Sequence, residues 1–163
     1  LHLSIRRQRQ MCIRDRCHAL IFVRIGGVYH HEAFYADSDT GELLGKYLVI
    51  LALPVRGDIV FRVLTSRHAH ARPTGCYHGA PYPGFALGVL GGELNRPTWV
   101  DLREQDDYDG DVFRGRMGKG IIRPILQLDA TLLRELLHCA ANADDATPRQ
   151  ERHMRDVMAA LVN

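Results

Sequence analysis

The sequence has few of the features that mark membrane-spanning or disulfide-rich secreted proteins. Only four of its 163 residues are cysteine, at Cys12, Cys17, Cys76 and Cys139, and none forms a CxxC pair. No stretch reaches the roughly 18 apolar residues that a transmembrane helix needs, and no secretory apolar segment is visible. We therefore expect a cytoplasmic protein with reduced thiols.

A broad excess of basic residues is also absent. The formal net charge is +2. Residues 1–16 carry five arginines against one aspartate, a net of +4, which leaves −2 for the rest of the chain. The remainder therefore has no wide positive field for nucleic acid, and any contact with RNA is expected to be local.

Residues 1–16 show neither helical nor strand periodicity. Within them, the MCIRDR stretch resembles translated library-adapter sequence, so we expect residues 1–16 to be non-native or disordered. The alternative is a basic arm that binds an acidic partner. The length of the rest favours one domain over residues 17–163, with a β-rich part at about 27–126 and a helical tail at about 129–162.

Strand patterns dominate the first part of this domain. β-branched and aromatic residues predict strands near 28–35, 46–53, 59–64, 85–90, 98–102 and 121–126. The run over 46–53 is apolar throughout, which is typical of a central strand covered on both faces. Residues 104–110 are interpreted as an acidic turn, and the pattern over 112–120 favours neither helix nor strand.

The period changes to that of helices in the tail. Asp129 is suited to cap a helix with an apolar face. Thr147, Pro148 and Gln150 fit a capping box that opens a second helix. Strands followed by helices predict an α+β fold, a small curled antiparallel sheet or partly open barrel with two C-terminal helices.

One family resemblance rests on the order of the first strands. A Val28-Tyr29 strand and a polar turn precede Gly45-Lys46, which opens a very apolar strand, and the following hairpin ends in Thr65-Ser66. This order resembles the MazF/PemK-type toxin family over about residues 27–66, and more loosely through residues 100–102 and the first tail helix. Lys46-Tyr47 stands where that family has Arg-Pro.

The resemblance implies an SH3-like barrel, a homodimer and a type II toxin–antitoxin system with a cognate antitoxin. It also implies an endoribonuclease that cleaves RNA without a metal or other cofactor. The reaction needs a base for the 2′-hydroxyl, an acid for the leaving 5′-oxygen and positive charge at the phosphate. The residues expected to supply these functions are Lys46 (charge), Thr65 or Ser66 (hydrogen bond to phosphate) and His68 (acid or base).

Other interpretations of these residues remain open, and one is that the chain is a diverged, inactive relative of that family. Lys46 also fits a solvated charge, and Thr65-Ser66 fits a turn that bonds its own backbone. Tyr77, Tyr82 and Phe85 are candidates for stacking on a substrate base, or for holding a protein partner in a non-enzymatic interaction domain built on the 67–85 loop. A further alternative is a zinc site, whose expected ligands are His68, His70, Cys76 and His78.

Overall fold

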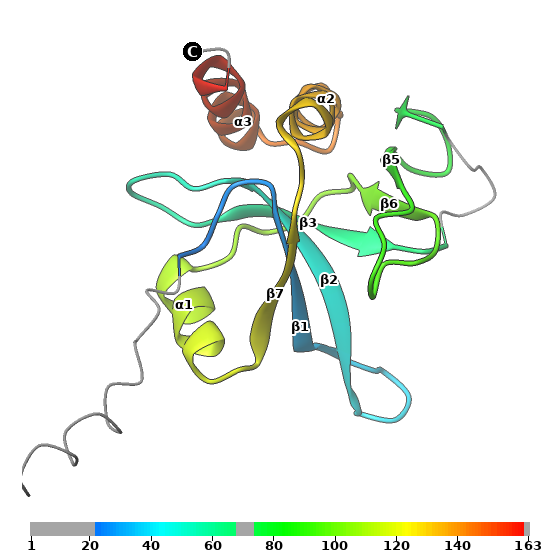
Figure 1. Cartoon of the computed structure of the whole chain (residues 1–163), viewed down its shortest axis with the longest axis vertical. Coiled ribbons are helices and arrows are strands. Elements are labelled where there is room, and N and C mark those ends of the chain that lie inside the picture. Colours follow the sequence, from blue (N-terminus) through cyan, green and yellow to red (C-terminus); the bar gives the residue numbers. More distant parts are fainter. Residues whose placement is uncertain (1–21, 68–73, 162–163) are drawn as a thin grey trace, which may run out of the picture.

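The computed structural model describes residues 22–67 and 74–161 and has the predicted α+β fold (Figure 1). Seven antiparallel strands form one sheet in the order β4-β5-β6-β3-β2-β1-β7. The strands are β1 (Gly27–Ala36), β2 (Leu43–Ala52), β3 (Val60–Thr65), β4 (Cys76–Tyr77), β5 (Gly84–Gly88), β6 (Thr98–Asp101) and β7 (Ile122–Gln127). The helices are α1 (Gly110–Gly118), α2 (Ala130–Ala141) and α3 (Pro148–Ala160).

The sheet is curled and open. Register shifts interrupt the β1–β2, β2–β3 and β5–β6 pairings, and such bulges bend a strand and increase its twist. β4 and β7 remain as the two edges. Of the two architectures that the sequence predicts, the curled antiparallel sheet is therefore confirmed, and closure into a barrel is not observed.

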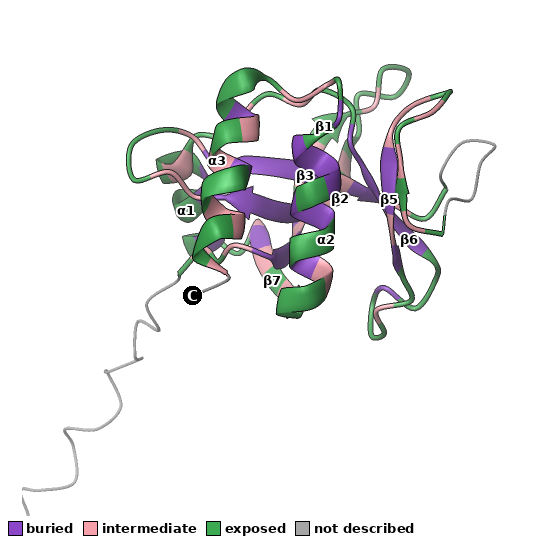
Figure 2. Ribbon diagram, turned by 90° about the horizontal axis from the view of Figure 1, so that it is seen from above, coloured by how far each residue is buried: buried purple, intermediate pink, exposed green. Residues whose placement is uncertain are grey.

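Each face of the sheet carries its own core (Figure 2). We call them the helix-side core, which α2 and α3 cover, and the α1-side core. In β2, Val49 and Leu51 face the helix-side core, while Leu48 and Ile50 face the α1-side core. Because successive side chains of a strand alternate between faces, a strand buried on both faces reads as the continuous apolar run that the sequence shows.

The two tail helices begin where their capping residues stand. The Asp129 carboxylate accepts hydrogen bonds from the backbone N–H of Thr131 and Leu132. Thr147 and Gln150 form both halves of a capping box around Pro148 at the start of α3. These contacts satisfy backbone donors that a helix leaves free at its first turn, so the predicted helix starts are confirmed.

Two elements are not anticipated by the sequence pattern. Asp109 caps α1 by accepting a hydrogen bond from the Val112 backbone N–H at 2.8 Å, and Phe113 and Met117 bury one side of this helix in the α1-side core. The short strand β4 pairs with β5 within the long segment between β3 and β5. None of the helices in the described ranges has the length and apolar character required to cross a membrane.

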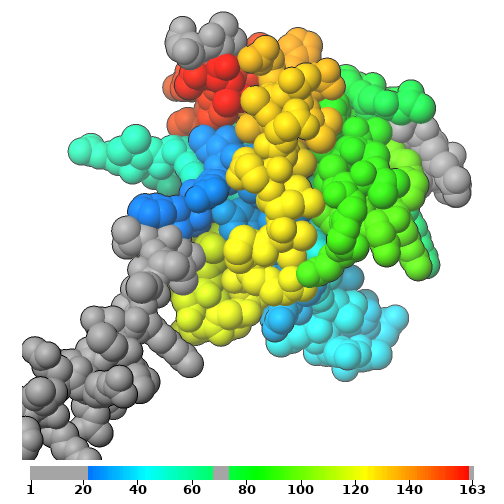
Figure 3. All heavy atoms as spheres, viewed as in Figure 1, coloured from blue at the N-terminus to red at the C-terminus, as the bar shows by residue number. Residues whose placement is uncertain are grey.

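The space-filling view shows how the β4–β6 region joins the rest of the chain. In Figure 3 the green atoms of the β5 region lie against the yellow atoms of β7 and α2. Helix α2 therefore packs against this outer part of the sheet, while the loop between β5 and β6 forms one wall of a cleft.

Candidate functional site

A cleft of about 510 Å³ opens between the start of β2, the end of β3 and the loop joining β5 to β6. It is lined by Gly45, Lys46, Tyr47, Leu64, Thr65, Ser66, Arg67, Glu93, Leu94, Asn95, Arg96 and Thr98. The cleft thus brings together three of the four catalytic candidates from the sequence, Lys46, Thr65 and Ser66. The fourth, His68, lies outside the described residues.

Lys46 and Thr65 lie on the same face of the sheet. Leu48 pairs with Val63 in the β2–β3 register, and both contribute to the α1-side core. Lys46 precedes Leu48 by two residues, and Thr65 follows Val63 by two, so strand alternation places both side chains on that face. Each is half-buried and belongs to the cleft lining. Tyr47 and Leu64, the next residue along β2 and the preceding one along β3, pack with the helix-side core and also line the cleft, so the cleft lies at the margin of the sheet and is lined from both faces.

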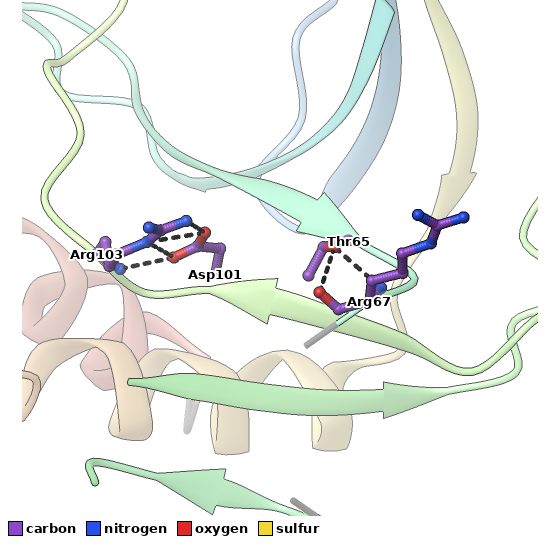
Figure 4. Close-up of polar contacts among 4 residues, drawn as sticks. All are labelled: Thr65, Arg67, Asp101 and Arg103. Atoms are coloured by element: carbon purple, nitrogen blue, oxygen red, sulfur yellow. Dashed lines mark hydrogen bonds and ion pairs between the residues drawn. The ribbon is translucent and has the colours of Figure 1, made fainter. Parts of the chain in front are cut away.

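The Thr65 hydroxyl shapes the turn that ends β3. It donates to the Arg67 carbonyl oxygen at 3.1 Å and accepts from the Arg67 backbone N–H at 3.0 Å (Figure 4). In this conformation its proton is already used, so Thr65 holds the turn, while the exposed Ser66 hydroxyl makes no side-chain hydrogen bond to any residue in 22–67 or 74–161. The Arg67 side chain extends away from the Asp101–Arg103 ion pair (Figure 4).

Within the cleft wall, the negative charge of Glu93 is compensated by the positive charge of Arg123. Its carboxylate accepts hydrogen bonds from the Arg123 guanidinium at 2.6 and 2.7 Å and from the Tyr47 hydroxyl at 2.9 Å. The hydrogen bonds from Arg123, followed by that from Tyr47, lower the pKa of Glu93 to about 2. The His30 ring packs against the Tyr47 ring with centroids 4.7 Å apart.

The remaining cleft charges are positive. Within residues 22–67 and 74–161, Lys46, Arg67 and Arg96 take part in no ion pair. The Lys46 ammonium lies 5.6 Å from the centroid of the Tyr35 ring, a cation–π distance. Lys46, Ser66, Arg67 and Arg96 are therefore all residues of the cleft lining, and the carboxylate of that lining, Glu93, is bound by Arg123.

The aromatic candidates lie elsewhere. Phe85 is 3% exposed in the helix-side core, so it is a core residue and its assignment as a substrate contact is wrong. The Tyr82 ring lies under the Arg103 guanidinium, 4.2 Å from its carbon. The Tyr77 hydroxyl donates to the Ala80 carbonyl oxygen at 2.5 Å. Neither tyrosine lines the cleft.

The predicted zinc ligands are only partly brought together. Cys76 is joined by a disulfide to Cys139 of α2, so the expectation of reduced thiols is wrong for this pair. His78 lies beside the bond, with Nε2 3.0 Å from the Cys76 Sγ. His68 and His70 fall outside the described residues, and Cys139 was not among the expected ligands.

Two of the buried polar residues, His31 and Arg62, are not predicted by the sequence to be buried. His31 is fully buried, with its Nε2 3.0 Å from the Tyr108 hydroxyl and 2.8 Å from an Arg116 nitrogen, and its Nδ1 accepts from the Ala33 backbone N–H. Burial, followed by the positive charge of Arg116, lowers the pKa of His31. His31 is therefore a neutral core histidine that connects β1 to α1.

The second buried polar group is Arg62, which is 1% exposed on the helix-side face of β3. Its guanidinium donates to the Phe61 carbonyl oxygen at 2.8 Å and to the Gln150 side-chain oxygen at 3.0 Å. Burial lowers the pKa of Arg62, while negative charges led by Asp107 raise it. The sequence shows Arg62 as a charged residue in an otherwise apolar strand. It does not indicate that the guanidinium is buried or that Gln150 is its partner.

Comparison with protein-family models, curated proteins and solved structures finds no match to this chain. The resemblance to the MazF/PemK-type family therefore stays a prediction, and the cleft has to be interpreted from its own chemistry.

Proposed function

We propose that the chain binds single-stranded RNA in the cleft between β2, β3 and the β5–β6 loop, and cleaves it without a metal ion. The observation that carries the proposal is the shared cleft of Lys46, Thr65 and Ser66, with Arg67 and Arg96 at its rim. A phosphodiester needs positive charge and hydrogen-bond donors within reach of one group, and the cleft offers both.

The charge balance of the cleft supports an anionic ligand. Glu93, whose pKa is about 2, keeps its negative charge at neutral pH but shares it with Arg123. Lys46, Arg67 and Arg96 have no such partner in the described ranges. The protein is nearly neutral overall, so this local excess fits a short stretch of backbone rather than a long duplex.

The proposed reaction is an internal transesterification. The ribose 2′-oxygen bonds to phosphorus and loses its proton to a base, while the bond from phosphorus to the 5′-oxygen breaks and that oxygen takes a proton from an acid. The products are a 2′,3′-cyclic phosphate and a free 5′-hydroxyl. Lys46 and Arg96 stabilise the charge on the phosphorane oxygens, and Ser66 donates a hydrogen bond.

Thr65 and His68 complete the assignment. Thr65 positions the turn that presents Ser66 and Arg67, through its two hydrogen bonds to the Arg67 backbone. His68, which is either the base or the acid in this proposal, is assigned from the sequence, where it follows Thr65 by three residues. Lys46 approaches phosphate as a point charge, whereas an arginine offers a planar fork.

The wider setting is proposed from the resemblance alone. It comprises action as a toxin of a type II toxin–antitoxin system, a homodimer, a cognate antitoxin and a cytoplasmic location. The interaction-domain alternative finds less support, because Phe85 is buried and the Tyr77 hydroxyl bonds within its own loop.

RNA binding tests the cleft assignment without requiring catalysis. Affinity for a short single-stranded RNA, measured by fluorescence anisotropy across salt concentrations, should fall in Lys46→Gln and Arg96→Gln. Each lost phosphate contact should reduce the slope of log affinity against log salt by about 0.7. Lys119→Gln, an exposed lysine outside the cleft, is the matched control. Equal affinity and slope in all four proteins would refute the assignment.

A further inference from the structure

A second cluster of reactive side chains lies away from the RNA cleft. It joins Cys76 of β4, His78 just after β4, and Cys139 of α2. The His78 Nε2 is 3.0 Å from the Cys76 Sγ and 3.7 Å from the Cys139 Sγ. Their ligand-type atoms all lie within 4.8 Å of one another.

We propose that this cluster is a zinc site when its disulfide is reduced, with the Cys76 and Cys139 thiolates and the His78 imidazole as ligands. Thiolate and imidazole are the ligands that zinc prefers. Zinc–sulfur bonds of about 2.3 Å and zinc–nitrogen bonds of about 2.0 Å, at a tetrahedral angle, place sulfur and nitrogen ligands about 3.5 Å apart. In the disulfide form the separations of the His78 Nε2 from the two sulfurs, 3.0 Å to Cys76 and 3.7 Å to Cys139, lie on either side of that value.

The backbone arrangement explains why the three groups converge. Cys76 and His78 are two residues apart on an extended segment, so their side chains leave it on the same side. β4 packs on α2, and the fully buried Cys139 lies on the face of that helix directed into the protein. The disulfide already shows that the two sulfurs reach each other.

Exposure determines what kind of metal site this is. Cys139 is buried, while Cys76 and His78 are exposed. Three protein ligands therefore hold the ion from one side and leave its fourth position toward solvent. Zinc sites with three protein ligands keep water or another small ligand in that position, so the proposed site is open and is not a closed structural site.

The surroundings favour a cation. A pocket of about 360 Å³ beside His78 is also lined by Asp144 and Asp145. The positively charged residue of that lining, Arg103, is already paired with Asp101, where its guanidinium donates to both carboxylate oxygens. The neighbourhood of the cluster is therefore net negative, which attracts a divalent ion.

The conversion between the two states balances chemically. Two equivalents of a small-molecule thiol, the reductant of the cytosol, give up two electrons and two protons to the disulfide and become one disulfide themselves. Zinc binding then displaces the two thiol protons as thiolates coordinate the ion. The disulfide and the metal site exclude each other, since the same sulfurs serve both. This inference does not rest on RNA cleavage.

The test uses the full chain with Cys12→Ser and Cys17→Ser, so that Cys76 and Cys139 are the only sulfur ligands left. The protein is reduced with a phosphine, loaded with zinc, desalted and analysed for metal by mass spectrometry. The proposal predicts one zinc per reduced chain and none per oxidised chain. Cobalt in place of zinc should give the visible bands of a tetrahedral ion and thiolate charge-transfer absorption.

Two variants separate coordination from adventitious binding. His78→Ala changes an exposed side chain, so we expect the fold to be retained, which far-ultraviolet circular dichroism checks, and zinc binding to weaken at least about tenfold against a competing chelator dye. His138→Ala, an exposed histidine of the same helix as Cys139, is the matched control and should bind as the parent does. The proposal is overturned if the reduced parent holds no stoichiometric zinc, or if His78→Ala binds as tightly as the control.

Discussion

The Glu93 carboxylate and the Arg123 guanidinium form a two-point ion pair, with nitrogen–oxygen distances of 2.6 and 2.7 Å. The pair ties the β5–β6 loop to edge strand β7, two parts of the chain that are distant in the sheet order. It therefore fixes one wall of the cleft and also removes most of the negative field from it.

Arg123→Gln should raise the pKa of Glu93 from about 2 toward the ordinary value of about 4.3, because it removes the stronger of the two sources of hydrogen bonds. Because the pKa of Glu93 is lower in the folded chain than in the unfolded chain, the ionised carboxylate stabilises the fold at pH values above the unfolded pKa. That contribution is lost as pH falls through about 2. Carboxyl carbon NMR titration measures the shift, with Arg152→Gln as an exposed control. A Glu93 that titrates near its ordinary value in the parent contradicts the ion pair.

His31 should make folding pH-dependent in mildly acidic solution. Its folded pKa is lowered by burial and by Arg116, so the unfolded chain binds a proton first as pH falls below about 6.5. Stability is thus retained above that pH and decreases as pH falls toward the lower folded pKa. Urea unfolding from pH 8 to 5 should show a shallower decrease in stability for His31→Gln than for His153→Gln, which changes a partly exposed histidine of α3. Parallel curves would refute the role of His31.

Arg62 and Gln150 should be energetically coupled. Gln150→Leu leaves the buried guanidinium of Arg62 with the Phe61 carbonyl alone, which should cost about 2–4 kcal/mol of unfolding free energy. Gln150 also bonds the Asp107 carboxylate and the Gln105 carbonyl, so a double-mutant cycle with Arg62→Met is needed to isolate the pair. The double variant should lose at least about 1 kcal/mol less than the sum of the single losses. Strict additivity would contradict the coupling.

The Cys76–Cys139 disulfide should stabilise the fold in oxidising buffer. It closes a loop with a sequence separation of 63 residues, for which the chain-entropy relation gives about 4 kcal/mol. Guanidinium unfolding with chelator present, with and without a phosphine reductant, measures the difference in the Cys12→Ser, Cys17→Ser background. Identical midpoints in the two redox states would show that the cross-link adds no stability.

Most of the strands and both tail helices follow from local patterns. The double-faced apolar run of β2 and the caps at Asp129 and Thr147 are signals carried by neighbouring residues. Helix α1 is different, because Gly110, Gly115 and Gly118 lower its helix propensity. It forms since Phe113 and Met117 bury in the α1-side core, a tertiary contact that no local pattern shows.

The candidate site likewise contains some residues whose positions follow from local patterns and others whose positions depend on tertiary contacts. Lys46 and Thr65 share a cleft as a consequence of the β2–β3 pairing, which the two adjacent strand patterns predict, although a register shift between Ile50 and Ala52 is not visible in the sequence. Arg96 and Glu93 belong to a loop whose position depends on Arg123, more than twenty residues later. Cys139 contacts Cys76 because α2 packs on β4. The residues next to Cys139 in the helix do not indicate that Cys76 is its partner.

RNA cleavage in the presence of chelator is the direct measure of whether the cleft is a metal-independent nuclease site. Purified full-length protein is incubated with a labelled single-stranded RNA in excess EDTA, and the products are resolved on a gel and assigned by their cyclic phosphate ends. We expect cleavage by the parent and by Lys119→Gln, and at least about a hundredfold slower cleavage by Lys46→Ala. Intact RNA with the parent, or equal rates with Lys46→Ala, would contradict this expectation.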